Sequence, residues 1–598
     1  MTIGPLLIRT LVPADAEAQP CPPARKPWVI ATAALAAATA LIDLPVVTMA
    51  LGGLRAEFGA SFAMAQWLLL LAGLATAALI LPSRRLGTLH GHWHVLGAGL
   101  LVSALGGCIA GLSPRLDLLF FGRLTQGVAA AVVLPASAAL IAVNFAPGER
   151  PGAFRTWTLT SGIGAVLATL AAGAAILAFG WRAAFLLPAA LSLATWALLR
   201  LRVPIDFPDL VQKPLDLAGA AILFASGGLI LVAITLAGIG FGLPVVAMLA
   251  GSGLVGLCLF GFWETGPAAE PMLALSRLRS PGFGLATGAA ALAEIGAAGT
   301  VFLLPIALME GSGRSALAAA LGLGCYLAGQ GASGVLAGRL QRRMAPPLAA
   351  ALGSGLGAAA LVLLALSVLA DLFWLGVLPA TLLLGLTAGA ASTILLAEAR
   401  RHGRASTTGD MQTVAIRFAI LIAIAASGTI AALAYRDLIG TLAPALSASP
   451  AGADFAAPSA EAAGFLSQRM TGVRLAFVRA ATVGAFVTGI AGLGALVLSR
   501  AGPAPPAPAA PKRNRHGPRT RRPAPWQERP ASPAPEATPA KPKRGARRVE
   551  PPSSEPSRRV GAEKPRSEEP PPVPPRRGAR RIAPPKLHQP SGPRPPRR

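Results

Sequence analysis

Three ionisable side chains lie within long apolar stretches of this 598-residue sequence. Asp43 lies in "ATALIDLPVVTMALGGL", Arg123 in "FFGRLTQGVAAAVVLP" and Glu294 in "FGLATGAAALAEIGAAGTVFLLP". A charge near the middle of a lipid bilayer costs at least about 2.5–3.5 kcal/mol, so such a residue usually faces a cavity and a partner. A carboxylate in that setting can bind a proton or a cationic group, and a guanidinium can pair with a carboxylate or an anion.

Depth within the apolar stretch separates these candidates. Glu294 lies near the middle of its stretch, which favours a functional role. Asp43 lies in the outer half of its predicted span and could instead meet headgroup water. Arg417 and Arg479 lie nearer the ends of theirs and could extend to the membrane surface.

The whole chain has a composition that suits a lipid environment. Hydrophobic residues make up 53% and charged residues 13%, about half the charged fraction of ordinary soluble domains. Fourteen apolar stretches are each long enough to cross about 30 Å of hydrocarbon; their Ala, Leu, Gly and Val content fits helices rather than membrane strands. They lie at 28–50, 64–82, 95–113, 118–143, 156–179, 183–199, 217–239, 243–263, 284–306, 316–337, 348–369, 373–396, 412–434 and 475–498. We therefore predict an all-α polytopic membrane protein.

Lysine and arginine in the connecting loops predict the orientation. With the N-terminus inside, the cytoplasmic loops hold eighteen of them and the outer loops seven. An even number of spans then returns the C-terminus to the cytoplasm. Residues 1–27 contain no apolar core of a cleavable signal, so we expect a cytoplasmic segment and targeting by the first span.

Residues typical of metal, redox or nucleotide chemistry show no matching pattern. The four cysteines have no paired spacing, and no stretch fits the phosphate-binding G-x-x-x-x-G-K-[ST] pattern. His90, His92 and His94 alternate without a neighbouring cysteine or carboxylate, so a plain loop is favoured over a metal site. We expect no cofactor, no metal and no enzymatic activity.

The segment 501–598 differs from everything before it. It holds 28 prolines, 24 lysines or arginines and seven glutamates, and "KRGARRVEPP" at 543–552 returns as "RRGARRIAPP" at 576–585. So few aliphatic residues cannot bury a core, which predicts a disordered, basic cytoplasmic tail. Its partner could be anionic lipid, RNA or a proline-recognition domain, or it could simply be solvated.

Several motifs between 28 and 498, in order and with the right spacing, resemble those of the fourteen-helix drug:proton antiporters of the major facilitator superfamily. "LIDLPVVTMALGGL" resembles the first-helix signature L-D-x-T-[IV]-V-N-V-A-L-P, in which Asp43 matches the aspartate. "FFGRLTQGVAAAVVLP" resembles R-x-x-Q-G through Arg123, Gln126 and Gly127.

Three further stretches extend this resemblance. "FGWRAAFLLP" resembles the W-R-x-x-F stretch that opens the sixth helix, through Trp181 and Arg182. "LDLAGAAIL" at 215–223 resembles the start of the seventh helix, and "EPMLALSRLRSPGF" at 270–283 the segment entering the ninth.

Two motifs depart from the family pattern. The loop after the second helix, about G-R-L-A-D-R-x-G-R-R in the family, reads "RRLGTLHGHW", with Arg84 in place of Gly and Thr88 in place of Asp. In such transporters that Asp is thought to help latch one conformation, so here the latch must be weaker or built differently. Only Gly173 survives of the fifth-helix G-P-x-x-G-G motif, which weakens the expectation of antiport.

The resemblance implies a major facilitator fold of six, two and six helices and a transporter that works by alternating access. The expected parts are a cytoplasmic segment 1–27, a bundle 28–201, two linking helices 202–267, a bundle 268–500 and the tail 501–598. It further implies proton-coupled efflux of lipophilic or amphipathic molecules. Asp43, Arg123 and Glu294 would then serve coupling or substrate binding, with Arg123 acting on Asp43 or on an anion.

Two alternatives stay open. The protein could be an uncoupled or symporting metabolite carrier, or a transport-inactive membrane anchor or sensor that acts through its tail. The Ala-, Gly-, Arg- and Pro-rich composition indicates a high-GC bacterium and hence an inner membrane. Substrate identity and oligomeric state are not fixed by these patterns.

Overall fold

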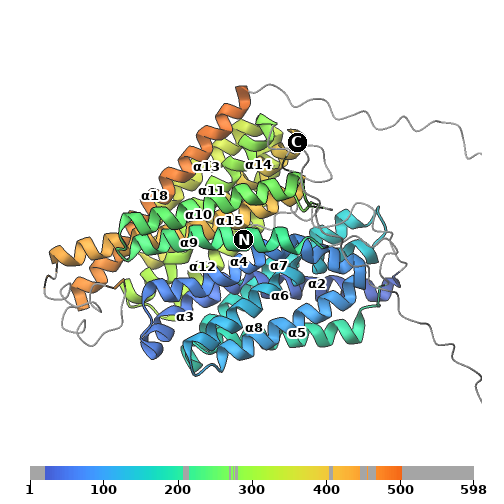
Figure 1. The fold of residues 1–598 in the computed structure, drawn as a ribbon, viewed down its shortest axis with the longest axis horizontal. Helices are drawn as coiled ribbons and strands as arrows, with labels where there is room; N and C mark the ends of the chain where they lie inside the picture. The colour runs from blue at the N-terminus through green and yellow to red at the C-terminus, as the bar shows by residue number, and fades with distance from the viewer. Residues whose placement is uncertain are drawn as a thin grey trace, which may run out of the picture. The chain divides into compact units, whose positions relative to one another are not determined.

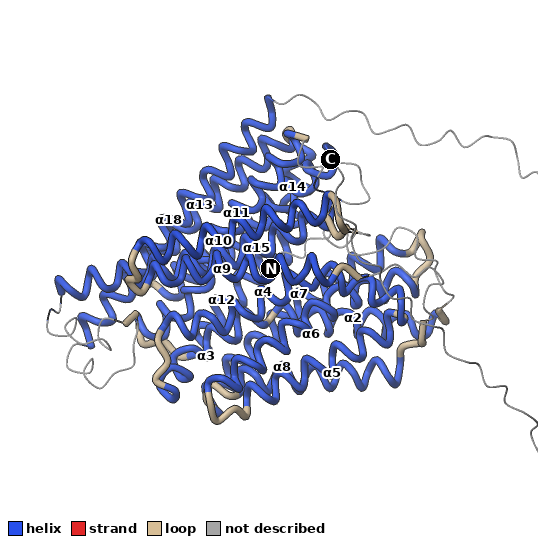
Figure 2. Tube along the Cα trace, in the orientation of Figure 1, coloured by secondary structure: helices blue, strands red, loops and turns tan. Residues whose placement is uncertain are grey.

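A computed structural model describes residues 21–206, 215–268, 271–273, 275, 280–402, 408–442, 444, 454–455 and 466–500. The chain divides into a unit of residues 1–512 and a second of 513–598, which lies wholly outside the described residues. The predicted tail and most of the predicted N-terminal segment therefore also lie outside them. Throughout the described ranges the regular structure is helical, without strands (Figures 1 and 2).

The helices follow one another through short connections. They are η1 (Pro23–Arg25), α2 (Lys26–Leu41), α3 (Asp43–Phe58), α4 (Phe62–His90), α5 (His92–Gly111), α6 (Leu116–Asn144), α7 (Arg150–Phe179), α8 (Ala183–Arg202), α9 (Leu217–Gly238), α10 (Leu243–Thr265), α11 (Pro281–Ile306), η3 (Ala307–Gly311), α12 (Ala316–Arg343), α13 (Pro346–Leu369), η4 (Phe373–Val377), α14 (Leu378–His402), α15 (Thr408–Leu442) and α18 (Leu466–Arg500).

This helical architecture confirms the predicted fold class. Among the described residues, 13 helical segments are long and apolar enough to cross a membrane. The remaining predicted span, 316–337, is the 28-residue helix α12. Several helices are longer than the apolar stretches that predict them: α15 and α18 each have 35 residues, about 52 Å at 1.5 Å per residue. Hydropathy detects only the part within hydrocarbon, so polar helix ends are missed.

The first span is broken at Ile42, beside Asp43. Pro45 has no N–H to donate to the carbonyl four residues earlier, and its ring crowds that carbonyl, so a helix bends here. The backbone bonds resume on both sides, with Ile42 N–H donating to Ala38 O at 3.1 Å and Val46 N–H to Ile42 O at 3.0 Å. The break places the Asp43 carboxylate at the first turn of α3.

Helices between residues 43 and 179 pack against helices between residues 281 and 442 along several seams. α7 packs on α12, α4 on α15, and α3 on α11, while α9 and α10 pair with each other and α9 also touches α4 and α15. These seams are where two bundles would have to move. The bundle boundaries at 201 and 268 remain a prediction.

Two motif glycines permit close helix contact. A Cβ on Gly127 of α6 would overlap the backbone of Ala72 in α4. A Cβ on Gly173 of α7 would overlap the Ala320 side chain and lie 3.0 Å from the Ala316 carbonyl oxygen, both in α12. Gly173, the surviving residue of the fifth-helix motif, thus lies at the α7–α12 seam.

The loops at 59–61 and 312–315 lie on the predicted outer side. The connections at 91 and 145–149 lie on the predicted cytoplasmic side.

Candidate functional site

Asp43 and Arg123 form a two-pronged ion pair. Arg123 Nη1 donates to Asp43 Oδ1 at 2.6 Å, and Nη2 donates to Oδ2 at 2.8 Å. The Arg123 side chain is fully buried, whereas the Asp43 side chain is 33% exposed. Matched planar groups give the strongest form of this contact. The structure therefore brings two predicted site residues together, with the carboxylate on the accessible side.

Two further groups accept hydrogen bonds from the Arg123 guanidinium. Its Nε donates to the Leu68 carbonyl in α4 at 2.9 Å, and Nη1 also donates to Gln126 Oε1 at 2.8 Å. The ring of Phe185 lies 6.0 Å from the guanidinium carbon, within reach of a cation–π contact. Gln126 of the R-x-x-Q-G motif and Phe185 of the W-R-x-x-F motif thus both serve the same arginine.

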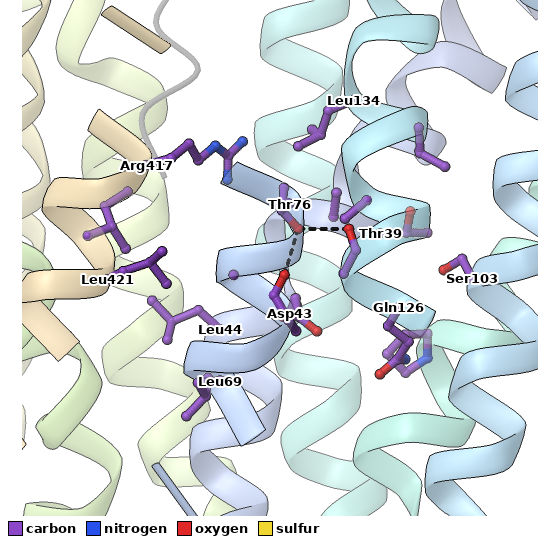
Figure 3. A pocket seen from close by; sticks show the side chains of 18 of the residues that line it. Thr39, Asp43, Leu44, Leu69, Thr76, Ser103, Gln126, Leu134, Arg417 and Leu421 are labelled. Atoms are coloured by element: carbon purple, nitrogen blue, oxygen red, sulfur yellow. Dashed lines mark hydrogen bonds between the residues drawn. The ribbon is translucent and has the colours of Figure 1, made fainter. Parts of the chain in front are cut away.

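The exposed side of Asp43 faces a cavity of about 60 Å³ (Figure 3). Its wall is mainly aliphatic, with a few hydroxyls and amides. Thr76, one of these, donates to the carbonyls of Ala72 and Gly127, both at 2.9 Å. The lining residues are Thr39, Ala40, Asp43, Leu44, Leu69, Ala72, Gly73, Thr76, Ser103, Gln126, Gly127, Ala130, Val133, Leu134, Pro188, Arg417, Ile420, Leu421 and Ile424.

Arg417 lines the same cavity, which its position near the end of an apolar stretch did not predict. It lies on α15 with Ile420, Leu421 and Ile424, at the spacing i, i+3, i+4, i+7 that marks one face of a helix. Figure 3 shows its guanidinium extending from α15 toward the side where Thr76 and Asp43 lie. The spacing was readable from the sequence, but not which neighbour that face meets.

Glu294 lies elsewhere. It sits in α11 with 1% of its surface exposed, and it is not among the residues that line the Asp43 cavity. It lies near Tyr326 of α12, whose hydroxyl accepts a hydrogen bond from Gln330 at 2.7 Å. The two carboxylates are thus placed in separate environments.

Trp181 and Arg182 hold the C-terminal end of α3, on the predicted outer side. Trp181 Nε1 donates to Glu57 Oε2 at 2.8 Å, and the two terminal nitrogens of Arg182 donate to Glu57 at 2.7 and 2.5 Å. This holds α3 against the start of α8, and so fixes the helix that carries Asp43.

A different pair stands where the family's loop latch is altered. Arg84, in place of the family's glycine, forms an ion pair with Asp410 at the start of α15. The carboxylate thus comes from the last third of the chain and the cation from α4. His92, in the same loop, begins α5: the backbone N–H groups of His92 and Trp93 donate to Asp206 at 2.7 Å each. No cluster of three potential metal ligands occurs among the residues that the structure describes.

On the predicted outer side, Arg55 binds a segment that lies between α15 and α18. Its Nη2 donates to Asp454 Oδ2 at 2.5 Å, and Nη1 donates to the Phe455 carbonyl at 2.7 Å. The N–H of Phe62 donates to the same carboxylate, and the Phe455 ring lies 4.8 Å from the Phe62 ring. Sequence reasoning missed this contact, since Arg55 and Asp454 are 399 residues apart.

Comparisons with known proteins agree with this geometry. The sequence profile of the Major Facilitator Superfamily matches residues 31–426. The puromycin resistance protein pur8 of Streptomyces alboniger is 32% identical over 279 residues, 46% of this chain and 55% of that protein. The cephamycin export protein CmcT of Amycolatopsis lactamdurans is 30% identical over 301 residues, 47% of this chain and 59% of that protein. The alignments thus span somewhat more than half the length of these relatives.

Solved structures resemble the chain in fold. A bacterial homologue of the human lysosomal transporter Spinster, in an inward-facing and occupied conformation, aligns with a TM-score of 0.55 at 15% identity, covering 79% of this chain and 97% of that one. The POT family transporter PepTSo aligns with a TM-score of 0.52 at 14% identity, covering 81% and 99%.

Proposed function

The chain belongs to the major facilitator superfamily, and from this premise we propose that it is a secondary active transporter that exports lipophilic or amphipathic small molecules in exchange for protons. The relatives that it matches include an antibiotic resistance protein and an antibiotic export protein, which supports efflux. We propose a multi-pass protein of the bacterial inner membrane with both termini in the cytoplasm, as the charge of the loops indicates.

One observation carries the proposal: the only carboxylate among the cavity-lining residues of the described structure is held by a fully buried arginine. A proton that binds Asp43 removes the negative charge that Arg123 pairs with. Arg123 then keeps only the Leu68 carbonyl, the Gln126 amide and the Phe185 ring. Because an unpaired buried charge is costly, the two protonation states of Asp43 favour different arrangements of α3 and α6.

The helix break gives this change a route to movement. Asp43 lies in the first turn of α3, directly after the break at Ile42, and α3 packs on α11 and α12. A change in the Asp43–Arg123 pair therefore acts on a helix that touches the other bundle. In alternating access such a contact is made in one state and broken in the other.

Opposed contacts at the two ends suit that cycle. Arg55–Asp454 joins early and late parts of the chain on the predicted outer side, and Arg84–Asp410 joins them on the predicted cytoplasmic side. Opening either side requires its pair to separate. The cavity of about 60 Å³ is smaller than the ~300–1,000 Å³ of typical ligand sites, so substrate would bind once one side has opened.

Everted membrane vesicles with an acid interior test the coupling. Adding a lipophilic substrate should release protons from wild-type vesicles, and Asp43→Asn should abolish that release. Asp117→Asn is the matched control, because Asp117 is exposed in the first turn of α6 and forms an ion pair with Arg115, two residues before it. Glu294→Gln tests the second predicted carboxylate, and we expect reduced coupling there too.

The outcomes separate the alternatives. Substrate movement without proton release in the wild type would favour the uncoupled carrier, which the missing fifth-helix motif also favours. Normal proton release by both Asp43→Asn and Glu294→Gln would remove these residues from the mechanism. Loss of phenotype on deleting residues 501–598, with no flux in any vesicle, would favour the anchor.

A further inference from the structure

Arg417 gives the cavity a positive charge with which no side chain among the described residues forms an ion pair. Among the cavity-lining residues that the structure describes, the charged ones are Asp43 and Arg417. Both oxygens of Asp43 are taken by Arg123. With Arg123 included, the three side chains sum to one net positive charge.

The neighbouring acidic groups on α15 are also engaged. Asp410 lies seven residues before Arg417, about 10 Å along the helix, and pairs with Arg84. Asp437, farther along, pairs with Arg479 at 2.9 Å. Within the described part of the chain, Arg417 itself forms neither an ion pair nor a hydrogen bond with another side chain.

The surroundings of Arg417 are otherwise mainly aliphatic, with a few hydroxyls such as that of Thr76. Ile420, Leu421 and Ile424 share its face of α15, and Leu44, Leu69 and Leu134 line the cavity from other helices. A cation in such a place gains most from an anionic partner, because water solvates it poorly there. A guanidinium offers paired N–H groups that match a carboxylate, while the aliphatic wall suits an apolar body.

We propose that Arg417 is the anchoring residue for an amphipathic organic anion, and that lipophilic carboxylates are the substrate class of this transporter. This rests on the proposed function and narrows it. The anionic group pairs with Arg417 on α15, and the apolar body lies against the leucines of α3, α4 and α6. Substrate then bridges both halves of the molecule, as a ligand that stabilises one state of an alternating-access cycle must. An inside-negative membrane potential also drives an anion outward.

A charge-matched set of substrates tests this. Proteoliposomes containing the purified full chain are supplied with three fluorescent compounds that share one aromatic body and carry a carboxylate, a neutral amide or a quaternary ammonium. We expect wild-type transport of the carboxylate to exceed that of the ammonium compound at least tenfold. Arg417→Gln should lower carboxylate transport at least tenfold and leave the neutral compound unchanged.

Two further variants separate charge from folding. Arg417→Lys keeps the charge without the planar pair of donors, so we expect part of the carboxylate transport to remain. Arg115→Gln removes an exposed arginine that pairs with Asp117 two residues on, and should change none of the three rates. Transport of the neutral compound by Arg417→Gln reports that this variant is folded.

Each result decides something. Transport of the ammonium or neutral compound without the carboxylate overturns the substrate class and leaves the proposed export function standing. Carboxylate transport that is equal in wild type and Arg417→Gln overturns the role of Arg417. No transport of any compound overturns both this inference and the proposed function.

Discussion

Two arginine–aspartate pairs in this molecule look alike locally and differ in what they join. Arg123–Asp43 and Arg55–Asp454 have contacts of 2.6 and 2.5 Å, arginine side chains that are 0% and 3% exposed, and aspartates that are 33% and 24% exposed. The first joins residues 80 apart, within neighbouring helices of one end of the chain. The second joins residues 399 apart, from α3 to the segment before α18.

In the proposed transport cycle, this difference in sequence separation gives the two ion pairs different roles. Arg123–Asp43 joins α3 and α6, which both lie within the first 144 residues, so in the proposed cycle it can persist while the two halves of the molecule move. Arg55–Asp454 spans the halves and must separate when the outer side opens. In the proposed cycle, similar chemistry would therefore serve a coupling site in one place and a closure in the other. Distance along the chain, rather than pair geometry, distinguishes the two roles.

The largest effect is expected from breaking the first pair. Arg123→Gln should abolish transport and lower the free energy of unfolding by about 3–5 kcal/mol, the usual cost of removing one partner of a buried ion pair. Thermal unfolding in detergent and vesicle transport measure the two effects. Arg115→Gln serves as control, and a fully active Arg123→Gln variant would contradict the proposed site.

Breaking the second pair should change conformation more than stability. Asp454→Asn removes the charge that holds Arg55, so we expect about a tenfold shift toward outer-open molecules, equivalent to about 1.4 kcal/mol. Spin labels at Leu112→Cys and Trp374→Cys, both exposed at the predicted outer side, measure the opening in a background without the native cysteines.

Asp371→Asn is the matched control for Asp454→Asn. Asp371 pairs with Arg314 at 3.1 Å, so its pair stays within the last half of the chain. Asp371 has a φ of 54°, a conformation that Asn also tolerates. Equal opening by both variants would mean that the span of the Asp454 contact is irrelevant.

Exchanging the charges of a pair sharpens the comparison further. Arg84→Asp or Asp410→Arg alone should open the predicted cytoplasmic side severalfold more often, and the double variant should restore closure. The same exchange at Asp43 and Arg123 should not restore transport. The position of Arg123 requires N–H donors for the Leu68 carbonyl and Gln126 as well as a charge. Restored transport in the double variant of Asp43 and Arg123 would show that only the charges matter at that pair.

The smallest effect is expected from an exposed pair. Lys26 donates to Glu149 at 2.7 Å. This contact, together with a hydrogen bond from the Ala146 N–H, lowers the pKa of the Glu149 carboxyl. At pH values above the ordinary glutamate pKa of about 4.3, a lowered pKa in the folded state stabilises the folded protein. That stabilisation is lost as the pH falls through the lowered pKa. A melting-temperature scan should show Glu149→Gln close to wild type near pH 7, with any difference vanishing in acid. A large difference in melting temperature at neutral pH would mean that this exposed pair contributes far more to stability than expected.

The fold was readable from the sequence because hydropathy is a local property. Apolar stretches marked the spans, whereas the break at Ile42, inside the predicted span 28–50, was not predicted. The depth of Arg123 and Glu294 in apolar stretches identified them as candidates, and the family resemblance offered Asp43 or an anion as the partner of Arg123. Which of these Arg123 contacts, and the position of Glu294 away from the cavity, could not be predicted, because each depends on which helix faces which neighbour.

The sequence by itself determined the class of protein, the number and order of its spans and the identity of the charges within them. The tertiary structure decided which charges meet: Asp43 with Arg123, Arg84 with Asp410, Arg55 with Asp454, and Arg417 with the cavity. The physical reason is that each stretch enters the bilayer according to its own transfer free energy. The partner of a buried charge depends instead on the rotation and packing of whole helices.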